Sequence, residues 1–175
     1  WNNRIKDITP LRGLTRLEYL SIGMNRVEDI SALEDLTNLT ELWVAENQIS
    51  NIDALADLIN LQELYAHENK IQDISALERL TQIQVLHLYK NNIRDIDILI
   101  NLTELRKLDL CHNHIRDISV LENLTKLNIL YLFQNEISDI TPLQNLTNLE
   151  ELEVRNNPAK DYSCVEFVPY LNELQ

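Results

Sequence analysis

Apolar and polar positions follow one another along this chain in a pattern that repeats every 22 residues. One unit runs Leu-x-x-Leu-x-Leu-x-x-Asn-x-Ile-x-Asp-Ile-x-x-Leu-x-x-Leu, and the stretch from Leu39 to Leu58 is a representative copy. The asparagine marks the period, which no insertion interrupts: Asn3, Asn25, Asn47, Asn69, Asn91, Asn113, Asn135 and Asn157. A fixed period of this length is typical of a solenoid, in which each unit buries its apolar face only against its neighbours.

Each complete unit is predicted to begin with a short strand, because two apolar residues flank one residue that must face the other way. The inward-facing pairs are Leu20/Ile22, Leu42/Val44, Leu64/Ala66, Leu86/Leu88, Leu108/Leu110, Leu130/Leu132 and Leu152/Val154. Stacked in parallel, these strands would form one open sheet. The asparagine after each strand is predicted to turn the chain inward and to satisfy backbone groups of the turn through its amide.

The rest of each unit returns along the opposite side and is too short for a long helix. We therefore expect one short 3₁₀ or α turn there. Its start carries Ser or Thr followed three residues later by Glu or Gln, which is the spacing of a helix-capping box. The pairs are Ser31/Glu34, Ser75/Glu78, Ser119/Glu122 and Thr141/Gln144.

The unit resembles the leucine-rich repeat, and two of its phrases are similar to internalin-like bacterial repeats. Leu-Thr-Asn-Leu occurs at 36–39 and 146–149, and Asp-Ile-Ser/Thr-x-Leu occurs at 29–33 and 139–143. The repeat length also resembles that of a eukaryotic regulatory subunit of a serine/threonine phosphatase, which typically has Ile-Glu-Gly-Leu where this chain has Ile-Ser-Ala-Leu. The resemblance implies an α/β leucine-rich-repeat solenoid in a right-handed arc, with a parallel sheet on the concave face and short 3₁₀ or α turns on the convex face.

The repeats define two regions of the chain. Residues 1–157 are predicted to be leucine-rich repeats, a partial first unit followed by seven strand-bearing units, and residues 158–175 a C-terminal cap helix. Apolar residues stand at helical spacing within the cap: Tyr162, Val165, Val168, Leu171 and Leu174. The partial first unit has no strand of its own, so we expect an N-terminal cap, and a leader could also precede Trp1.

Charge and composition limit the classes of partner. The net charge of −13 argues against nucleic acid or anionic lipid, because binding to phosphates needs a basic footprint. A protein partner fits this charge, and a basic one fits most readily. No apolar run approaches the ~18 residues of a membrane-spanning helix, so no membrane insertion is expected. Cys111 and Cys164 lie too far apart along the solenoid for a disulfide, and we expect free thiols in a monomer.

The chain lacks the motifs of common enzymes. Its two glycines, Gly13 and Gly23, exclude a P-loop, a Rossmann fingerprint and a Gly-x-Ser-x-Gly elbow. Four potential zinc ligands are expected on neighbouring strands of one face: His67, His87, Asp109 and Cys111. However, the outermost two are two strands apart, at ~9–10 Å. We therefore predict no catalytic residue, no metal site and no cofactor.

Outward-facing strand positions hold an unusual number of aromatic side chains. They fall in two neighbouring columns of the predicted sheet: Trp43, Tyr65, Tyr89, Tyr131 and Phe133. Polar residues on the same face complete the predicted partner-binding set: Glu41, Glu63, His67, His87, Lys107 and Asp109. Large aromatic residues seldom gather on a solvent-facing surface without use, and they dominate binding hot spots. Alternatively, the rings stabilise the sheet through cross-strand pairs.

The sequence thus predicts a protein-protein interaction module that binds its partner on a concave aromatic face. The resemblance implies an internalin-like bacterial surface or secreted module for adhesion or recognition. Two alternatives stay open: an intracellular regulatory or targeting subunit of an enzyme such as a serine/threonine phosphatase, and an assembly scaffold without a single partner. A secreted or cell-surface location is favoured over a cytoplasmic one.

Overall fold

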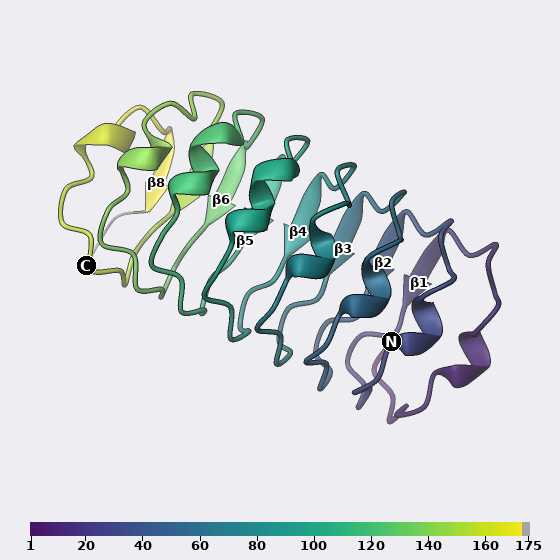
Figure 1. Cartoon of the computed structure of the whole chain (residues 1–175). Helices are drawn as coiled ribbons and strands as arrows, with labels where there is room; N and C mark the ends of the chain where they lie inside the picture. The colour runs from purple at the N-terminus through teal and green to yellow at the C-terminus, as the bar shows by residue number, and fades with distance from the viewer. Residues whose placement is uncertain (173–175) are drawn as a thin grey trace.

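The computed structural model describes residues 1–172, which wind into a solenoid of short strands and 3₁₀ turns (Figure 1). The strands are β1 (Tyr19–Ser21), β2 (Glu41–Trp43), β3 (Glu63–Tyr65), β4 (Val85–His87), β5 (Lys107–Asp109), β6 (Ile129–Tyr131), β7 (Glu151–Glu153) and β8 (Tyr170–Asn172). The 3₁₀ turns are η1 (Thr9–Leu11), η2 (Ser31–Leu33), η3 (Asp53–Leu55), η4 (Ser75–Leu77), η5 (Asp97–Asn101), η6 (Ser119–Asn123), η7 (Thr141–Leu143) and η8 (Ser163–Val165). The predicted short turns are confirmed.

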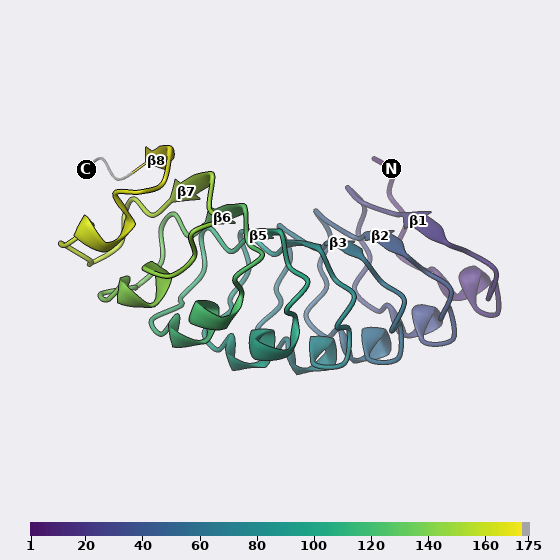
Figure 2. The same ribbon diagram turned by 90° about the horizontal axis from the view of Figure 1, so that it is seen from above.

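The strands form a single parallel sheet in sequence order, each strand pairing with the next. The register places equivalent residues of successive units side by side, as in Leu20↔Leu42 and Leu42↔Leu64. Seen from above, the strands line the inner side of an arc and the 3₁₀ turns line its outer side (Figure 2). The sheet therefore forms the concave face and the turns form the convex face, which confirms the predicted solenoid.

The repeated asparagine joins each turn to the preceding unit. Asn47 Nδ2 donates hydrogen bonds to the carbonyl oxygens of Val44 (3.0 Å), Ala45 (3.1 Å) and, in the unit before, Ile22 (3.1 Å). Its Oδ1 accepts the backbone N–H of Val27 at 2.9 Å. Similar contacts recur at the later asparagines of the column. Because an unpaired buried backbone group costs about 1–3 kcal/mol, the asparagine column is structural, as predicted.

The residue before each asparagine adopts the left-handed backbone conformation, with φ between 53° and 56°. After the strands these residues are Met24, Glu46, Glu68, Lys90, His112, Gln134 and Asn156. This conformation costs a residue with a side chain roughly 1–2 kcal/mol. Hydrogen bonds to the next unit hold it in place, such as that from Glu46 N–H to the carbonyl oxygen of His67 at 2.9 Å.

The 3₁₀ turns are capped by an acidic or amide side chain that precedes them. In η2, Asp29 Oδ1 accepts the N–H of Ser31 at 2.8 Å, whereas the residue at the N-cap position is Ile30, which is buried in the core and offers no side-chain acceptor. The predicted Ser/Thr capping boxes are therefore wrong. The serine is the first residue of the turn, and the acceptor comes from the residue two positions earlier, in an Asx turn.

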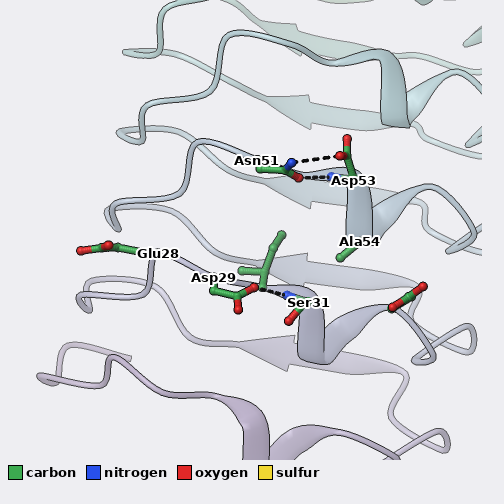
Figure 3. Close-up of a pocket in the computed structure, with 8 residues that line it drawn as sticks. Glu28, Asp29, Ser31, Asn51, Asp53 and Ala54 are labelled. Carbon is green, nitrogen blue, oxygen red and sulfur yellow. Dashed lines mark hydrogen bonds between the residues drawn. The ribbon is translucent and has the colours of Figure 1, made fainter.

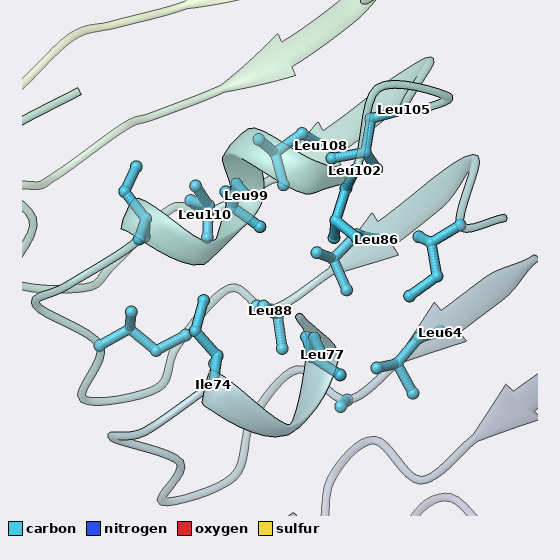
Figure 4. Close-up of a cluster of buried hydrophobic side chains, with 14 of the residues drawn as sticks. Leu64, Ile74, Leu77, Leu86, Leu88, Leu99, Leu102, Leu105, Leu108 and Leu110 are labelled. Carbon is cyan, nitrogen blue, oxygen red and sulfur yellow. The ribbon is translucent and has the colours of Figure 1, made fainter. Parts of the chain in front are cut away.

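Leucine and isoleucine fill the space between the sheet and the convex turns (Figure 4). Side chains from two neighbouring strands and from the turns behind them meet in the same interior: Leu77, Leu86, Leu88, Leu99, Leu108 and Leu110. All six are fully buried. Each unit therefore adds one apolar layer that is completed by the layers on either side.

The helix predicted over residues 158–175 is not formed in the described part of that segment. Instead η8 and β8 make one more turn of the solenoid, and β8 pairs in parallel with β7. Val165 and Val168 lie three residues apart, but so do apolar residues of every return arm, such as Leu33 and Leu36. Helical spacing and repeat spacing therefore coincide. Leu174 lies outside the described residues, and the role of this segment as a cap stays a prediction.

Replacing a central core leucine should destabilise the whole solenoid. Leu108 is fully buried, so Leu108→Ala should lower the free energy of unfolding by ~2–5 kcal/mol through lost contacts and a residual cavity. Equilibrium denaturation with urea measures the change. A loss below about 0.5 kcal/mol would contradict the burial of this side chain.

The capping aspartates should make the fold sensitive to acid. The N–H of Ser119, at 2.8 Å from Asp117 Oδ1, holds the pKa of that carboxyl below its usual value. A lowered pKa in the folded state stabilises the protein above the unfolded pKa of ~3.9, and this stabilisation is lost as the pH falls through the folded pKa. Asp117→Asn should flatten this part of the acid limb while preserving the cap, as Asn51 does for Asp53 N–H at 2.7 Å.

Urea denaturation at pH 7 and pH 3 would compare the wild type with Asp117→Asn and, as the variant that removes the acceptor, Asp117→Ala. We expect Asp117→Ala to be less stable at both pH values. An unchanged pH dependence in Asp117→Asn would contradict the assigned pKa direction.

Candidate functional site: the concave sheet face

The register of the sheet collects the predicted binding residues on its concave face. The first residues of β2 and β3, Glu41 and Glu63, are neighbours across the strands. The third residues form a second column through Trp43, Tyr65, His87, Asp109 and Tyr131. In the central strands these outer positions flank a fully buried leucine and stay half-buried, except Asp109, which is buried.

Six aromatic rings form a continuous series of contacts over the N-terminal half of this face. We call this set the ring ladder: Trp1, Trp43, Tyr65, His87, His67 and Tyr89. The rings of Trp43 and Tyr65 are stacked with centroids 3.7 Å apart, and those of His67 and Tyr89 are stacked at 4.3 Å. The ring of His87 lies 5.0 Å from Tyr65 and 6.3 Å from His67, and so joins the two stacks. Cross-strand ring contact, the alternative role considered for these residues, is therefore present.

Trp1 belongs to the ladder but was missing from the predicted site. Its ring meets that of Trp43 edge to face, with centroids 5.9 Å apart, and it lies against Gly23 so closely that any side chain there would clash with it. A glycine in a column that otherwise carries side chains was the signal in the sequence. The absence of a Cβ at Gly23 leaves the space that the indole occupies.

The two remaining predicted aromatic residues lie outside the ladder, in the C-terminal half of the face. The ammonium of Lys107 lies 6.0 Å from the ring centroid of Tyr131. The guanidinium of Arg155 lies 5.7 Å from the ring centroid of Phe133, whose edge also meets His112 at 5.0 Å. Sequence reasoning did not place His112 or Arg155 in the site. Cations therefore lie over both of these rings, as Lys90 also does over Tyr89 of the ladder, at 5.9 Å from its centroid.

Two carboxylates are hydrogen-bonded to the polar edges of the ladder. Trp43 Nε1 donates to Glu41 Oε1 at 2.5 Å, and the hydroxyl of Tyr65 donates to Glu63 Oε2 at 2.7 Å. Burial, followed by the hydrogen bond to Glu63 and the charges of both glutamates, raises the pKa of Tyr65. The Tyr65 hydroxyl therefore keeps its proton and acts as a donor at neutral pH.

His87 and Asp109 are close but do not form a full ion pair at neutral pH. His87 Nδ1 lies 3.7 Å from Asp109 Oδ2. Burial, with smaller contributions from Lys107 and His67, lowers the pKa of His87 to about 4, so its ring is neutral at pH 7. Burial also raises the pKa of Asp109, although the N–H of Cys111, 3.1 Å from its Oδ1, opposes that shift.

The possible zinc ligands do not converge. Within residues 1–172, no three His, Cys, Asp or Glu side chains are arranged to hold a metal ion. Burial lowers the pKa of His67, and its Nδ1 is buried with no hydrogen-bond partner. Burial raises the pKa of the Cys111 thiol, which disfavours the thiolate that zinc would require.

Several grooves lie between neighbouring units, away from the ring ladder. One is lined by Glu28, Asp29 and Ser31 from one unit and by Asn51, Asp53 and Ala54 from the next (Figure 3). Its polar groups serve the turns: Asp29 accepts the N–H of Ser31, and Asn51 Nδ2 donates to Asp53 Oδ2 at 2.9 Å. This groove is explained by the capping pattern and adds no functional residue.

A family model described as leucine-rich repeats in two copies matches the chain in overlapping segments. They are residues 1–35, 15–57, 37–79, 59–101, 81–123, 103–145 and 125–166. The chain therefore belongs to the leucine-rich-repeat family, a class of protein-interaction modules. Its repeats are internalin-like, as two solved structures show.

An internalin (inlF) from Listeria monocytogenes is 40% identical with a TM-score of 0.91, and the match covers 93% of this chain and 48% of that chain. Internalin C2 (inlC2) of the same organism is 33% identical with a TM-score of 0.91, and the match covers 97% and 76% of the two chains. This chain thus spans about half of the first relative and three quarters of the second. No curated protein matches the chain.

A plant peptide hormone receptor, RGFR1 in complex with RGF2, shares the fold alone. It is 24% identical with a TM-score of 0.79, over 90% of this chain and 27% of that chain.

In residues 1–172, none of the helical segments has the length and hydrophobicity to cross a membrane.

The low pKa of His87 predicts how the stability of the folded protein depends on pH. An unfolded histidine titrates near pH ~6.5, whereas His87 in the folded protein titrates at about 4. Since only the unfolded state binds this proton between the two values, stability should fall as the pH drops through that window. Lys107→Gln should raise the pKa of His87, but not to ~6.5, because burial is the larger cause.

Proton NMR of the His87 ring measures this pKa. Lys126→Gln, which removes a charge paired with Glu104, is the control and should leave the His87 titration unchanged. A titration of His87 near pH ~6.5 in the wild type would contradict its neutral, buried state.

Proposed function

We propose that this leucine-rich-repeat domain binds a protein partner on its concave face, as an internalin-like bacterial surface or secreted module for adhesion or recognition. The observation that carries the proposal is the ring ladder, a series of aromatic side chains on a sheet face that no other layer of residues 1–172 covers (Figure 2). The predicted site consists of the aromatic residues Trp43, Tyr65, Tyr89, Tyr131 and Phe133 with the polar residues Glu41, Glu63, His67, His87, Lys107 and Asp109.

Preorganisation of the rings favours a role in binding. A ring already fixed by stacking has little conformational entropy left to lose when a partner covers its exposed edge. Aromatic residues are also the commonest anchors of protein interfaces. On the return arms within residues 1–172, exposed large apolar side chains such as Ile59, Ile100 and Phe167 belong to different units.

The class of partner follows from charge and from the relatives. The net charge of −13 favours a partner with a basic surface. Two relatives with similar repeats are internalins of a bacterium, which supports a surface or secreted setting. We expect the domain to act as a monomer, so that the whole concave face is available to the partner.

Mutation of single rings tests this function. Trp43→Ala, Tyr89→Ala and Phe133→Ala should each weaken partner binding, the best-placed of them by ~2 kcal/mol or more, while circular dichroism shows an unchanged fold. Candidate partners captured by the wild-type domain would be purified and titrated with each variant by calorimetry.

Controls come from the convex side. Ile100→Ala removes an exposed apolar side chain, and Arg12→Ala and Arg79→Ala remove charges from the return arms. All three should bind the partner as the wild type does. Loss of binding in the convex variants, with binding intact in the three ring variants, would refute the concave site and leave the rings with a sheet-stabilising role alone.

A further inference from the structure

The carboxylates of Glu41 and Glu63 belong to directly paired residues of neighbouring strands. They stand side by side on β2 and β3, one strand spacing apart, a separation of ~4.8 Å between backbones. Like charges directly opposite on neighbouring strands repel each other and destabilise a sheet. A feature that costs stability on an otherwise regular sheet indicates a site that is completed by something outside the chain.

Two other glutamates on or beside the concave face have a cationic partner, whereas Glu46 and Glu151 form no ion pair within residues 1–172. Glu68 pairs with Lys90 at 3.0 Å, and Glu153 pairs with Arg155 at 2.6 Å. Glu41 and Glu63 form no ion pair with any of the residues that the structure describes. Within residues 1–172, the only side-chain hydrogen bonds to the carboxylates of Glu41 and Glu63 come from Trp43 and Tyr65.

These two hydrogen bonds hold the carboxylates in place and leave other lone pairs of their oxygens free to accept further hydrogen bonds. A carboxylate offers about four lone-pair positions, and the ladder occupies one oxygen of each glutamate. The free oxygens therefore remain available beside a rigid stack of two aromatic rings. Carboxylates and aromatic rings are the two surroundings in which a guanidinium is bound best, because its planar fork of five N–H donors matches both.

We propose that Glu41 and Glu63, held in place by Trp43 and Tyr65, receive an arginine side chain of the protein partner. The inference rests on the proposed function and specifies the chemistry of the segment that lies over β2 and β3. The guanidinium lies between the two carboxylates and against the edges of the stacked rings. It supplies the positive charge that the sheet itself lacks at this place.

The blocked tripeptide acetyl-Gly-Arg-Gly-amide is a probe that needs no knowledge of the partner. The chain has two tryptophans, so the indole N–H signal of Trp43 can be assigned in a nitrogen-15 NMR spectrum by comparison with Trp1→Phe. We expect the probe to shift this signal saturably. The same peptide with citrulline, which has nearly the same shape but no charge, should leave it unchanged.

A matched pair of double variants separates the site from general attraction to an acidic protein. The double variant that combines Glu41→Gln with Glu63→Gln keeps an oxygen acceptor for both ring donors. It should weaken binding of the arginine peptide at least tenfold. Glu78→Gln with Glu122→Gln removes the same charge from exposed convex positions and should change it less than twofold. If the first double variant does not fold, the single variants Glu41→Gln and Glu63→Gln should each weaken binding.

Three results would overturn the arginine site: no saturable shift with the arginine peptide, an equal shift with the citrulline peptide, or equal weakening in both double variants. They would not refute partner binding on the concave face, which is tested by the alanine variants of Trp43, Tyr89 and Phe133. Conversely, failure of those alanine variants to weaken partner binding, together with a positive peptide titration, would show a cation site that the partner does not use.

Discussion

The hydrogen bonds of the asparagine column are the interaction on which the rest of this structure depends. Each amide ties its own turn to backbone groups of the unit before, as Asn47 does with Ile22 and Val27. The residue before it has a left-handed conformation that a side chain would otherwise avoid, and a hydrogen bond to the next unit holds it there, as from Glu46 N–H to His67. Because the bond is made once per repeat, successive strands are locked at the same height, and the sheet can have only one register.

A single register places equivalent residues of successive units in columns one strand apart. On the side of the sheet that faces the turns, this produces an unbroken core of mainly leucine and isoleucine, in which each layer is buried by the next. On the concave side it brings side chains into lateral contact whether or not they attract each other. The stack of Trp43 on Tyr65 and the apposition of Glu41 with Glu63 have the same geometric origin. The ring contact is favourable, whereas the apposition of two like charges is repulsive.

The two faces of the solenoid use their polar groups differently. On the convex side, aspartates such as Asp29 and Asp117 accept hydrogen bonds from backbone N–H groups of the turns and so have a structural role. On the concave face, burial dominates: it keeps His87 neutral and Tyr65 protonated. The concave face therefore presents rings and hydrogen-bonding groups of fixed protonation at neutral pH, together with the adjacent carboxylates of β2 and β3. This combination suits recognition of a protein surface.

The sequence alone determined the solenoid, its register and which side chains share the concave face, since a period of 22 residues leaves a single way to stack the apolar positions. Only the tertiary structure decided what those side chains do to one another. Whether Trp1 reaches Trp43 depends on the space above Gly23, and whether the C-terminal segment forms a helix or another turn depends on the neighbouring strand β7. The capping residue was misassigned because Ile30, at the cap position, is drawn into the core. The first two outcomes depend on contacts between residues of different repeats, and the third depends on whether a residue is buried or caps the turn. The pattern of residues within one unit does not contain this information.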